Sequence, residues 1–540
     1  MRCLSVESPP RASLARSAEL RGEIGQVPGR IGQRVRRKRA ARPADGGVLS
    51  APPLLRSSAP LSAVRTELRA LVALALPIVG VQLSQMAMSF VDVVMVGRLG
   101  TEALAAVVLG STTFFTLALV CVGVVLAVNP MVSQAVGAGD AEGVARAARQ
   151  GLWLATLLGV PFTVALGWSE DFLLWTGQEP ETAALAGGYL SAIRWGFLPN
   201  LWFTALRGLC EGVGRPRAIL GVTLVGVALN AALNYALMFG AWGAPALGVV
   251  GTGWSSAGVM WAMAVLLGAW VLWAMPEVEV FQRLRRPDGA MLRALFALGW
   301  PIGVTFGLEA GLFSAATLIV GRFGTEALAA HQVALNAASV TFMVPLGVGM
   351  AGGVRVGQAA GRGDAAGVAR AGWTAIGVGA AFMVLSALAF WLAPEIVVWL
   401  YAGRDPDAGV ASLAVTLLRA AAVFQLVDGI QSTAAGALRG LKDTRVPMAI
   451  AGVSYWGVGL AVGAGLAFGA GWGAVGLWWG LACGLAVAAA LLTARFGRLA
   501  RRASRAPSAG AGTSAADASA ADASAADVSG GEKPGPAHPG

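Results

Sequence analysis

Hydrophobic residues fill long, almost uncharged stretches of the chain, and short polar segments separate these stretches. Each stretch holds about 20 residues or more, enough for a helix to cross a hydrocarbon core of roughly 30 Å. The stretches are continuously apolar and do not alternate with polar residues, so they favour helices over strands. The pattern predicts an all-α integral membrane protein with twelve spans, near residues 71–97, 105–129, 150–168, 184–206, 217–240, 248–273, 294–320, 328–352, 372–400, 411–437, 446–469 and 473–495.

Several phrases of the first half return in the second half. VGRLGTEALAA, ending at Ala106, returns as VGRFGTEALAA, ending at Ala330, and ALRGL of the fourth span returns in the tenth. Because each half holds six spans, both halves begin on the same side of the membrane and the two repeats are parallel. Secondary transporters use this arrangement and bind substrate between the two halves. We therefore predict two six-helix lobes around a central cavity.

The repeated phrase also predicts local structure. Gly100 and Gly324 suit a tight turn, and Glu102 and Glu326 fall in the first turn of the next helix, where the helix dipole favours acids. The repeats and polar segments predict two lobes, an N-terminal one at residues 66–275 and a C-terminal one at 291–497. A cytoplasmic linker at 276–290 joins them, a basic disordered arm at 1–65 precedes them and a disordered tail at 498–540 follows them.

Composition supports the membrane assignment. The 540 residues are 56% apolar and 13% charged, with a mean hydropathy of +0.67, which excludes a soluble globular protein. The net charge of +11 is concentrated in the first 60 residues, where twelve Arg and Lys face four acids. The run RVRRKRAAR is compatible with nucleic acid, with anionic lipid, or with a disordered cytoplasmic arm or an early start codon. We favour a disordered cytoplasmic arm or an early start codon, and we expect no nucleic-acid partner.

The remaining basic residues indicate the orientation. With the N-terminus in the cytoplasm, most arginines and lysines of the connections fall on the inner side, as the positive-inside rule requires. We therefore expect a multi-pass protein of the bacterial inner (plasma) membrane with both termini in the cytoplasm. Scattered cysteines and histidines offer neither a disulfide framework nor a zinc site: Cys3, Cys121, Cys210, Cys483, His331 and His538.

Three acids lie deep inside predicted spans: Asp92, Glu309 and Asp428. An ionised carboxylate is costly in hydrocarbon, so such an acid faces a cavity, finds a partner or takes up a proton. Two acids facing one cavity repel each other unless a cation or proton lies between them, and an ion-driven pump needs that coupling. These acids are the predicted charge-handling residues, with Glu309 and Asp428 as the candidate Na⁺ ligands and no other metal site.

Polar side chains share helix faces with these acids. Gln85 precedes Asp92 by two turns, and Asn230 and Asn234 lie one turn apart in the fifth span. Their amide oxygens can ligate Na⁺ together with the carboxylate, or the amides can hold a protonated Asp92, or they can simply bind helix to helix. The second half has its own set around the acids, with Gln332 and Asn336 as supporting ligands and four candidate cavity residues: Thr305, Phe424, Gln425 and Ser432.

Three longer motifs carry a resemblance to a known family. FVDVVMVGRLG ends the first span, the stretch from Ala330 to Gly361 covers the eighth, and AAGALRGLKDTRVP follows the tenth. Across roughly residues 65 to 495 the chain resembles the multidrug and toxic compound extrusion (MATE) transporters, most closely their NorM-like branch. The resemblance implies cation-coordinating acids at Glu309 and Asp428, and a first-span acid at Asp92 with the polar pair of the fifth span. One departure is Phe424, where a tyrosine is common.

The sequence therefore predicts a secondary antiporter that exports amphipathic or cationic organic compounds in exchange for Na⁺ or H⁺, with no cofactor. Its expected partners are small organic substrates and the lipid bilayer, and we expect a monomer. The alternative is a flippase for lipid-linked saccharides or another organic-solute exporter of the same superfamily, although paired cavity acids disfavour a pyrophosphate. We expect no enzyme, since no catalytic triad, metal cluster or phosphate-binding glycine loop occurs in the sequence.

Overall fold

The structure is a computed structural model that describes residues 60–281, 287–403 and 407–505. Throughout these residues the regular elements are helices, and eleven of them are long and apolar enough to cross a membrane. The predicted basic arm up to residue 59 and the predicted tail after Arg505 lie outside the described residues. Within the described part, α3 (Pro60–Val96) begins ahead of the predicted lobe boundary at residue 66.

The fourth predicted span, residues 184–206, is broken in the structure. α8 (Pro180–Ile193) and α9 (Phe197–Gly212) are joined by a 3₁₀ turn, η4 (Arg194–Gly196). Pro199 lies in the first turn of α9 and cannot donate to the carbonyl of Trp195, so a continuous helix would leave that carbonyl unpaired. The Trp261 indole donates to the Trp195 carbonyl instead, at 3.1 Å. Counted with this broken pair, the described residues contain the twelve predicted crossings.

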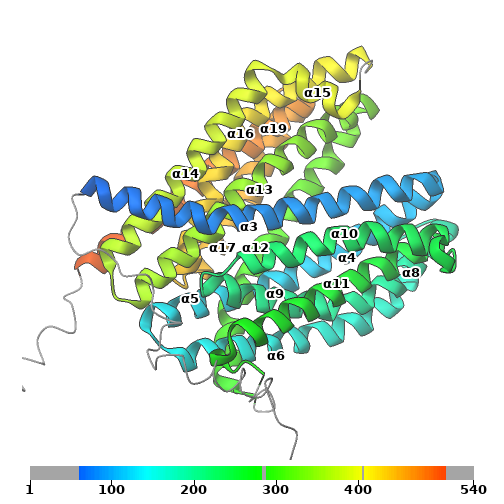
Figure 1. Cartoon of the computed structure of the whole chain (residues 1–540). Helices are drawn as coiled ribbons and strands as arrows, with labels where there is room; N and C mark the ends of the chain where they lie inside the picture. The colour runs from blue at the N-terminus through cyan, green and yellow to red at the C-terminus, as the bar shows by residue number, and fades with distance from the viewer. Residues whose placement is uncertain (1–59, 282–286, 404–406, 506–540) are drawn as a thin grey trace, which may run out of the picture. The chain divides into compact units, whose positions relative to one another are not determined.

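The first six crossings form what we call the N-lobe (Figure 1). Its first crossing is α3, and its fourth is the broken pair α8 and α9. The remaining helices are α4 (Thr101–Val125), α5 (Val128–Ala138), α6 (Ala141–Ala165), α7 (Ser169–Trp175), α10 (Arg217–Phe239) and α11 (Gly248–Ala274).

The last six crossings form the C-lobe. The eleventh crossing of the chain contains two π-helical stretches. A π-helix is rare and often marks a functional site. The helices are α12 (Gly289–Val320), α13 (Thr325–Gly361), α14 (Ala365–Leu392), α15 (Pro394–Ala402), α16 (Ala408–Gly440), α17 (Arg445–Gly452), η8 (Val453–Leu460), α18 (Ala461–Ala464), η9 (Gly465–Gly469) and α19 (Gly473–Arg505).

The predicted turns of the repeat are confirmed. Gly100 has φ 116° and Gly324 has φ 103°, values that residues other than glycine rarely adopt. Glu102 and Glu326 then lie in the first turns of α4 and α13, as predicted. The same backbone solution was therefore kept in both copies.

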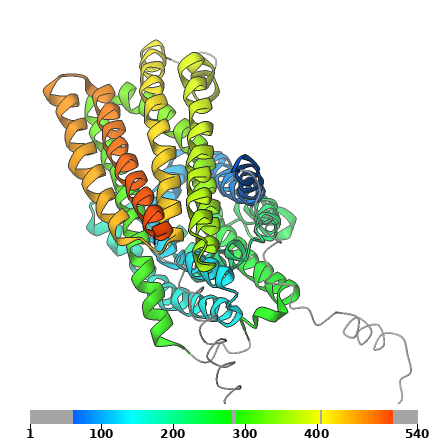
Figure 2. The same cartoon turned by 90° about the vertical axis from the view of Figure 1, so that its left-hand side faces the viewer.

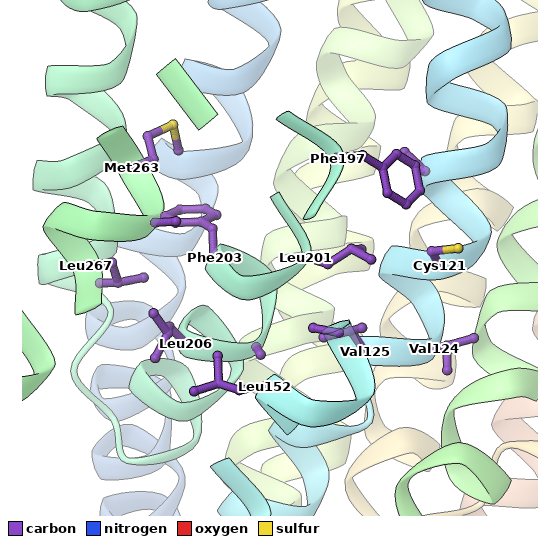
Figure 3. Packing of buried hydrophobic residues seen from close by; sticks show 14 of the residues in the cluster. Cys121, Val124, Val125, Leu152, Phe197, Leu201, Phe203, Leu206, Met263 and Leu267 are labelled. Carbon is purple, nitrogen blue, oxygen red and sulfur yellow. The ribbon is translucent and has the colours of Figure 1, made fainter. Parts of the chain in front are cut away.

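Apolar packing between helices of the N-lobe builds a continuous core. Phe197 and Leu201 of α9 point toward Cys121 and Val125 of α4, and Leu206 of α9 lies near Leu152 and Leu267 (Figure 3). These side chains come from α4, α6, α9 and α11, and each is at most 7% exposed: Cys121, Val125, Leu152, Phe197, Leu201, Leu206 and Leu267. The broken fourth crossing is thus anchored by the helices around it.

The two lobes contact each other through α12 on α4 and through α13 on α3 and α5. Glycine allows the close approach of α12 to α4, because a Cβ at Gly299 would lie 2.1 Å from the carbonyl oxygen of Val124. Polar contacts also bridge the lobes. The Arg355 guanidinium donates to both carboxylate oxygens of Glu67 at 2.8 Å, and Gln134 donates to the Gly440 carbonyl at 2.8 Å.

Candidate ion and substrate sites

The acid of the N-lobe, Asp92, is held by two amides from α10. Asn230 donates to Asp92 Oδ1 at 3.0 Å, and Asn234 donates to the same oxygen at 2.6 Å. Both asparagines are buried, and the Oδ1 atom of each has no hydrogen-bond partner within the described residues. The structure therefore brings together the acid and the polar pair that the sequence predicted. Two buried amide oxygens beside a carboxylate are suitable ligands for a hard cation.

A tyrosine that the sequence analysis missed stands near this acid. Tyr189 of α8 is 3% exposed and lies within electrostatic range of Asp92. The chain has only four tyrosines, so their rarity was a usable signal. The position of Tyr189 could not be read from the sequence, because the break between α8 and α9 sets how α8 packs against α4 and α11.

The C-lobe brings Glu309 of α12 and Asp428 of α16 within electrostatic range of each other. Asp428 is 5% exposed and Glu309 is partly buried. In contrast to Asp92, neither carboxylate has a hydrogen-bond or ion-pair partner among residues 60–281, 287–403 and 407–505. Two unpartnered acids within electrostatic range of each other repel unless a cation or a proton compensates their charge.

A second tyrosine completes this group. Tyr455 lies in the π-helical stretch η8, is 1% exposed, and lies within electrostatic range of Glu309 and Asp428. Its hydroxyl accepts a hydrogen bond from Nε2 of Gln431, which leaves the hydroxyl hydrogen available for another acceptor. Phe424 of α16 stands where a tyrosine is common, and η8 supplies Tyr455, a residue that was not expected from the sequence.

The candidate cavity residue Phe424 is enclosed by protein. It is 2% exposed and packs edge-to-face against Trp478 and Phe313, with ring centroids 5.5 and 6.0 Å away. The Trp478 indole in turn donates to Nδ1 of His331 at 3.1 Å. In this conformation Phe424 belongs to a packed aromatic cluster and has no surface with which to stack on a substrate.

The other candidate polar residues divide into buried and accessible ones. Gln425 is fully buried, and its Oε1 accepts from Thr341 at 2.6 Å and from Ser386 at 2.7 Å. Thr305 donates to the backbone of its own helix at Pro301. Ser432 is buried, Gln85 is partly buried, and the supporting pair of α13 is exposed: Gln332 and Asn336.

The repeated ALRGL phrase supplies one arginine to each lobe. Arg207 of α9 forms a buried ion pair with Glu211 at 2.7 Å and donates to Gln82 at 2.8 Å. Arg439 of α16 has no ion-pair partner within the described residues, and it lies over the Phe306 ring and within electrostatic range of Glu309. A basic group thus lies within electrostatic range of Glu309, which was not expected from the sequence.

No cluster of three or more His, Cys, Asp or Glu residues in the described part of the chain is arranged to hold a metal ion. By themselves, Glu309 and Asp428 offer a pair of carboxylates with neighbouring polar groups. Such a set suits a weakly held, exchangeable ion better than a permanently bound transition metal.

The MatE family model matches residues 77–236 and 301–464, one stretch in each lobe. The chain belongs to the MatE family. The resemblance to the MATE transporters and to their NorM-like branch is thereby confirmed. Because each match covers most of one lobe, the two repeats correspond to two copies of the MatE domain.

Relatives support the MatE assignment over most of the chain. The chain is 45% identical over 449 residues to "Probable multidrug resistance protein NorM" of Rhizobium meliloti (strain 1021), covering 82% of this chain and 96% of that protein. It is 44% identical over 426 residues to "Multidrug resistance protein NorM" of Burkholderia vietnamiensis, covering 78% and 92%. This MatE chain is thus a multi-pass membrane protein of a bacterial transporter family.

A solved structure shows the same fold. "Crystal structure of MATE in complex with MaL6" aligns with a TM-score of 0.76 at 19% identity, covering 81% of this chain and 97% of that chain. The predicted all-α class with two six-helix lobes is confirmed. The likeness at this identity concerns the MatE fold and not the ligand.

Proposed function

We propose that this protein is a secondary antiporter that exports amphipathic or cationic organic compounds in exchange for Na⁺ or H⁺. The observation that carries the proposal is the pair of unpartnered acids in the C-lobe, Glu309 and Asp428, next to Tyr455. The names of the NorM relatives, which describe multidrug resistance, support the same substrate class.

Electrostatic exclusion supplies the coupling in this proposal. When no cation or proton is bound at Glu309 and Asp428, their negative charges attract one. Once a cation or proton is bound, the two side chains no longer attract a cationic substrate. A small movement of the Tyr455 hydroxyl would let it donate to a carboxylate in the empty state, and its oxygen could face a bound Na⁺ in the loaded state. The ion and the substrate therefore exclude one another at this group of side chains.

Asp92 handles charge differently in this proposal. Asn230 and Asn234 now donate to the carboxylate, and rotating either terminal amide by half a turn would present its oxygen instead. An amide oxygen suits a bound cation or a protonated Asp92, so the pair can follow a change of charge without moving a helix. The buried oxygens that lack partners support this role.

Alternating access is the proposed transport movement. The polar bridges between the lobes, Glu67 with Arg355 and Gln134 with Gly440, lie at the ends of α3, α5, α13 and α16 that the positive-inside rule assigns to the cytoplasm. This distribution favours a conformation closed toward the cytoplasm. Separation of these contacts would open the cavity to the cytoplasm.

The remaining expectations belong to the same proposal. We infer that the chain lies in the bacterial inner membrane with both termini in the cytoplasm, that it works as a monomer, and that it neither binds nucleic acid nor catalyses a chemical reaction. The transported small molecule is an organic compound, and a gradient of Na⁺ or H⁺ drives its export.

Dye efflux from liposomes containing the purified full-length protein tests this function. A Na⁺ gradient or a pH gradient should drive export of a fluorescent cationic dye, and Glu309→Gln or Asp428→Asn should reduce the coupling by up to about 100-fold. Asp92→Asn tests the N-lobe acid in the same assay. Glu326→Gln is the matched control, because it neutralises an exposed acid of the same lobe and should change the rate by roughly two-fold or less.

Two outcomes would count against the proposal. If neither gradient moves a cationic dye, the antiporter assignment fails and flipping of a lipid-linked saccharide becomes the next assay. If a gradient drives export but the three substitutions leave it intact, the transporter remains and the roles assigned to the acids fail. Size-exclusion profiles of each variant establish that a lost activity is not a lost fold.

A further inference from the structure

A groove of ≈ 650 Å³ lies on the C-lobe where α14, α16 and α19 meet. These three helices lie side by side, with α19 in orange to red beside α16 in yellow (Figure 1 and Figure 2). Trp373 of α14 and Ile430 of α16 form its walls, and α19 supplies much of its floor. The groove is separate from the acids, since neither Glu309 nor Asp428 lines it.

The floor of the groove changes character along α19. Ala486, Ala490, Ala494 and Gly497 recur on one helical face and leave a narrow apolar channel. Twelve residues separate Ala486 from Arg498, a length of roughly 18 Å along a helix. At the end of the channel the lining changes to Arg498 and Arg501, and no lining residue among those described carries a carboxylate.

The two arginines are exposed and free of ion pairs within the part of the chain that the structure describes. Arg495, one turn earlier, is instead bound to Asp443 through two hydrogen bonds. In the floor next to them, Oγ1 of Thr493 is buried and has no hydrogen-bond partner among the described residues. The groove thus offers two free cationic groups at the end of an apolar channel.

We propose that this groove binds an anionic phospholipid, with an acyl chain along the small-residue face of α19 and the phosphate at Arg498 and Arg501. Charge complementarity selects an anionic headgroup, because two guanidinium groups face no acid. The apolar channel selects a lipid over a soluble phosphate, since each buried methylene contributes to binding. Trp373, 46% exposed at the wall, is suited to the boundary between chain and headgroup.

Native mass spectrometry of the delipidated full-length protein tests the site. Phosphatidylglycerol should bind more tightly than phosphatidylcholine with the same chains, and R498Q/R501Q should reduce its affinity by roughly 30-fold, about five-fold for each charge. The matched control is R502Q/R505Q, which removes the same charge from the same helix end at positions that do not line the groove. This control should bind phosphatidylglycerol as the wild type does.

A second pair of measurements tests the acyl chain. A490L/A494L fills the channel without changing charge and should also weaken phosphatidylglycerol binding, whereas soluble glycerol phosphate should not compete. The proposal is overturned if both lipids bind equally or if the two arginine double variants lose the same affinity. It is also overturned if A490L/A494L binds phosphatidylglycerol as the wild type does, or if glycerol phosphate competes.

Discussion

The two lobes contain the same phrase, ALRGL followed by an acid, yet the two arginines have different partners. In the N-lobe α9 continues to Gly212, so Arg207 and Glu211 share a helical face and form an ion pair at 2.7 Å. In the C-lobe α16 ends at Gly440, and Lys442 adopts φ 59°. Asp443 therefore leaves the helical face and binds Arg495 of α19. One turn of helix decides which arginine is neutralised.

The same contrast holds for the acids inside the lobes. The N-lobe acid receives two hydrogen bonds from amides, while the C-lobe acids have none within the described residues, and the unpaired Arg439 lies within electrostatic range of Glu309. Fixed partners stabilise one charge state, whereas groups without fixed partners respond to a bound ion. The C-lobe is therefore better suited to exchange ions, and the following predictions test this difference.

The largest effect is expected at the buried ion pair of the N-lobe. Glu211→Gln leaves Arg207 charged and buried, so we expect the free energy of unfolding to fall by about 3–5 kcal/mol. Asp443→Asn, in the C-lobe copy, breaks a more exposed pair and should cost about 1 kcal/mol or less. Unfolding monitored in detergent measures both. Equal losses of unfolding free energy in the two variants would show that the two ion pairs contribute equally to stability and would contradict the difference between the lobes.

A second prediction concerns the acids. Asp92→Asn removes an acceptor of two amide hydrogen bonds and should lower the free energy of unfolding by about 1.5–3 kcal/mol. Asp428→Asn replaces a buried, unpartnered carboxylate by a neutral isostere and should raise that free energy by about 1 kcal/mol. Thermal unfolding in ion-free buffer distinguishes the two signs. A destabilised Asp428→Asn would reveal a stabilising partner for this acid.

The two buried tyrosines should also differ. Tyr455→Phe removes the hydroxyl that accepts the amide hydrogen of Gln431 and should cost about 1 kcal/mol. Tyr189 forms no hydrogen bond with the described residues, so Tyr189→Phe should change stability by about 0.5 kcal/mol or less. Matched thermal unfolding curves provide the measurement. A larger loss for Tyr189→Phe would contradict this assignment of roles.

A comparably small effect, of opposite sign, is expected at the turn that ends α16. Lys442 has a positive φ that favours glycine, so Lys442→Gly should stabilise the protein by about 0.5–1 kcal/mol. Lys442→Ala removes the same charge but keeps a Cβ, and it should give no such gain. If both variants gain equally, the charge and not the backbone explains the effect.

Much of the fold could be predicted from the sequence because membrane helices obey local rules. The length and hydropathy of each stretch predict a crossing, and the glycines of the repeat predict the turns at Gly100 and Gly324. The break at Pro199 was missed, since a proline in a membrane helix often only bends it. Its outcome depended on Trp261, which lies on another helix and satisfies the freed carbonyl.

The candidate site followed a similar division. Asp92, Glu309 and Asp428 could be selected from the sequence, because acids are rare and costly in apolar spans. Tyr455 could not be assigned to them, since it reaches Glu309 and Asp428 from η8, and Arg439 could not be assigned to Glu309, since the two lie on different helices, α16 and α12.

The sequence by itself determined the twelve crossings, the duplicated lobes, the tight turns and the identity of the buried acids, because each depends on neighbouring residues along the chain. Only the tertiary structure decided which of those charges have partners. Hydrogen bonds and ion pairs act over a few ångströms, and such distances between residues far apart in the chain are set by how helices pack and where they end. That is why one arginine of a repeated phrase is paired and the other is free.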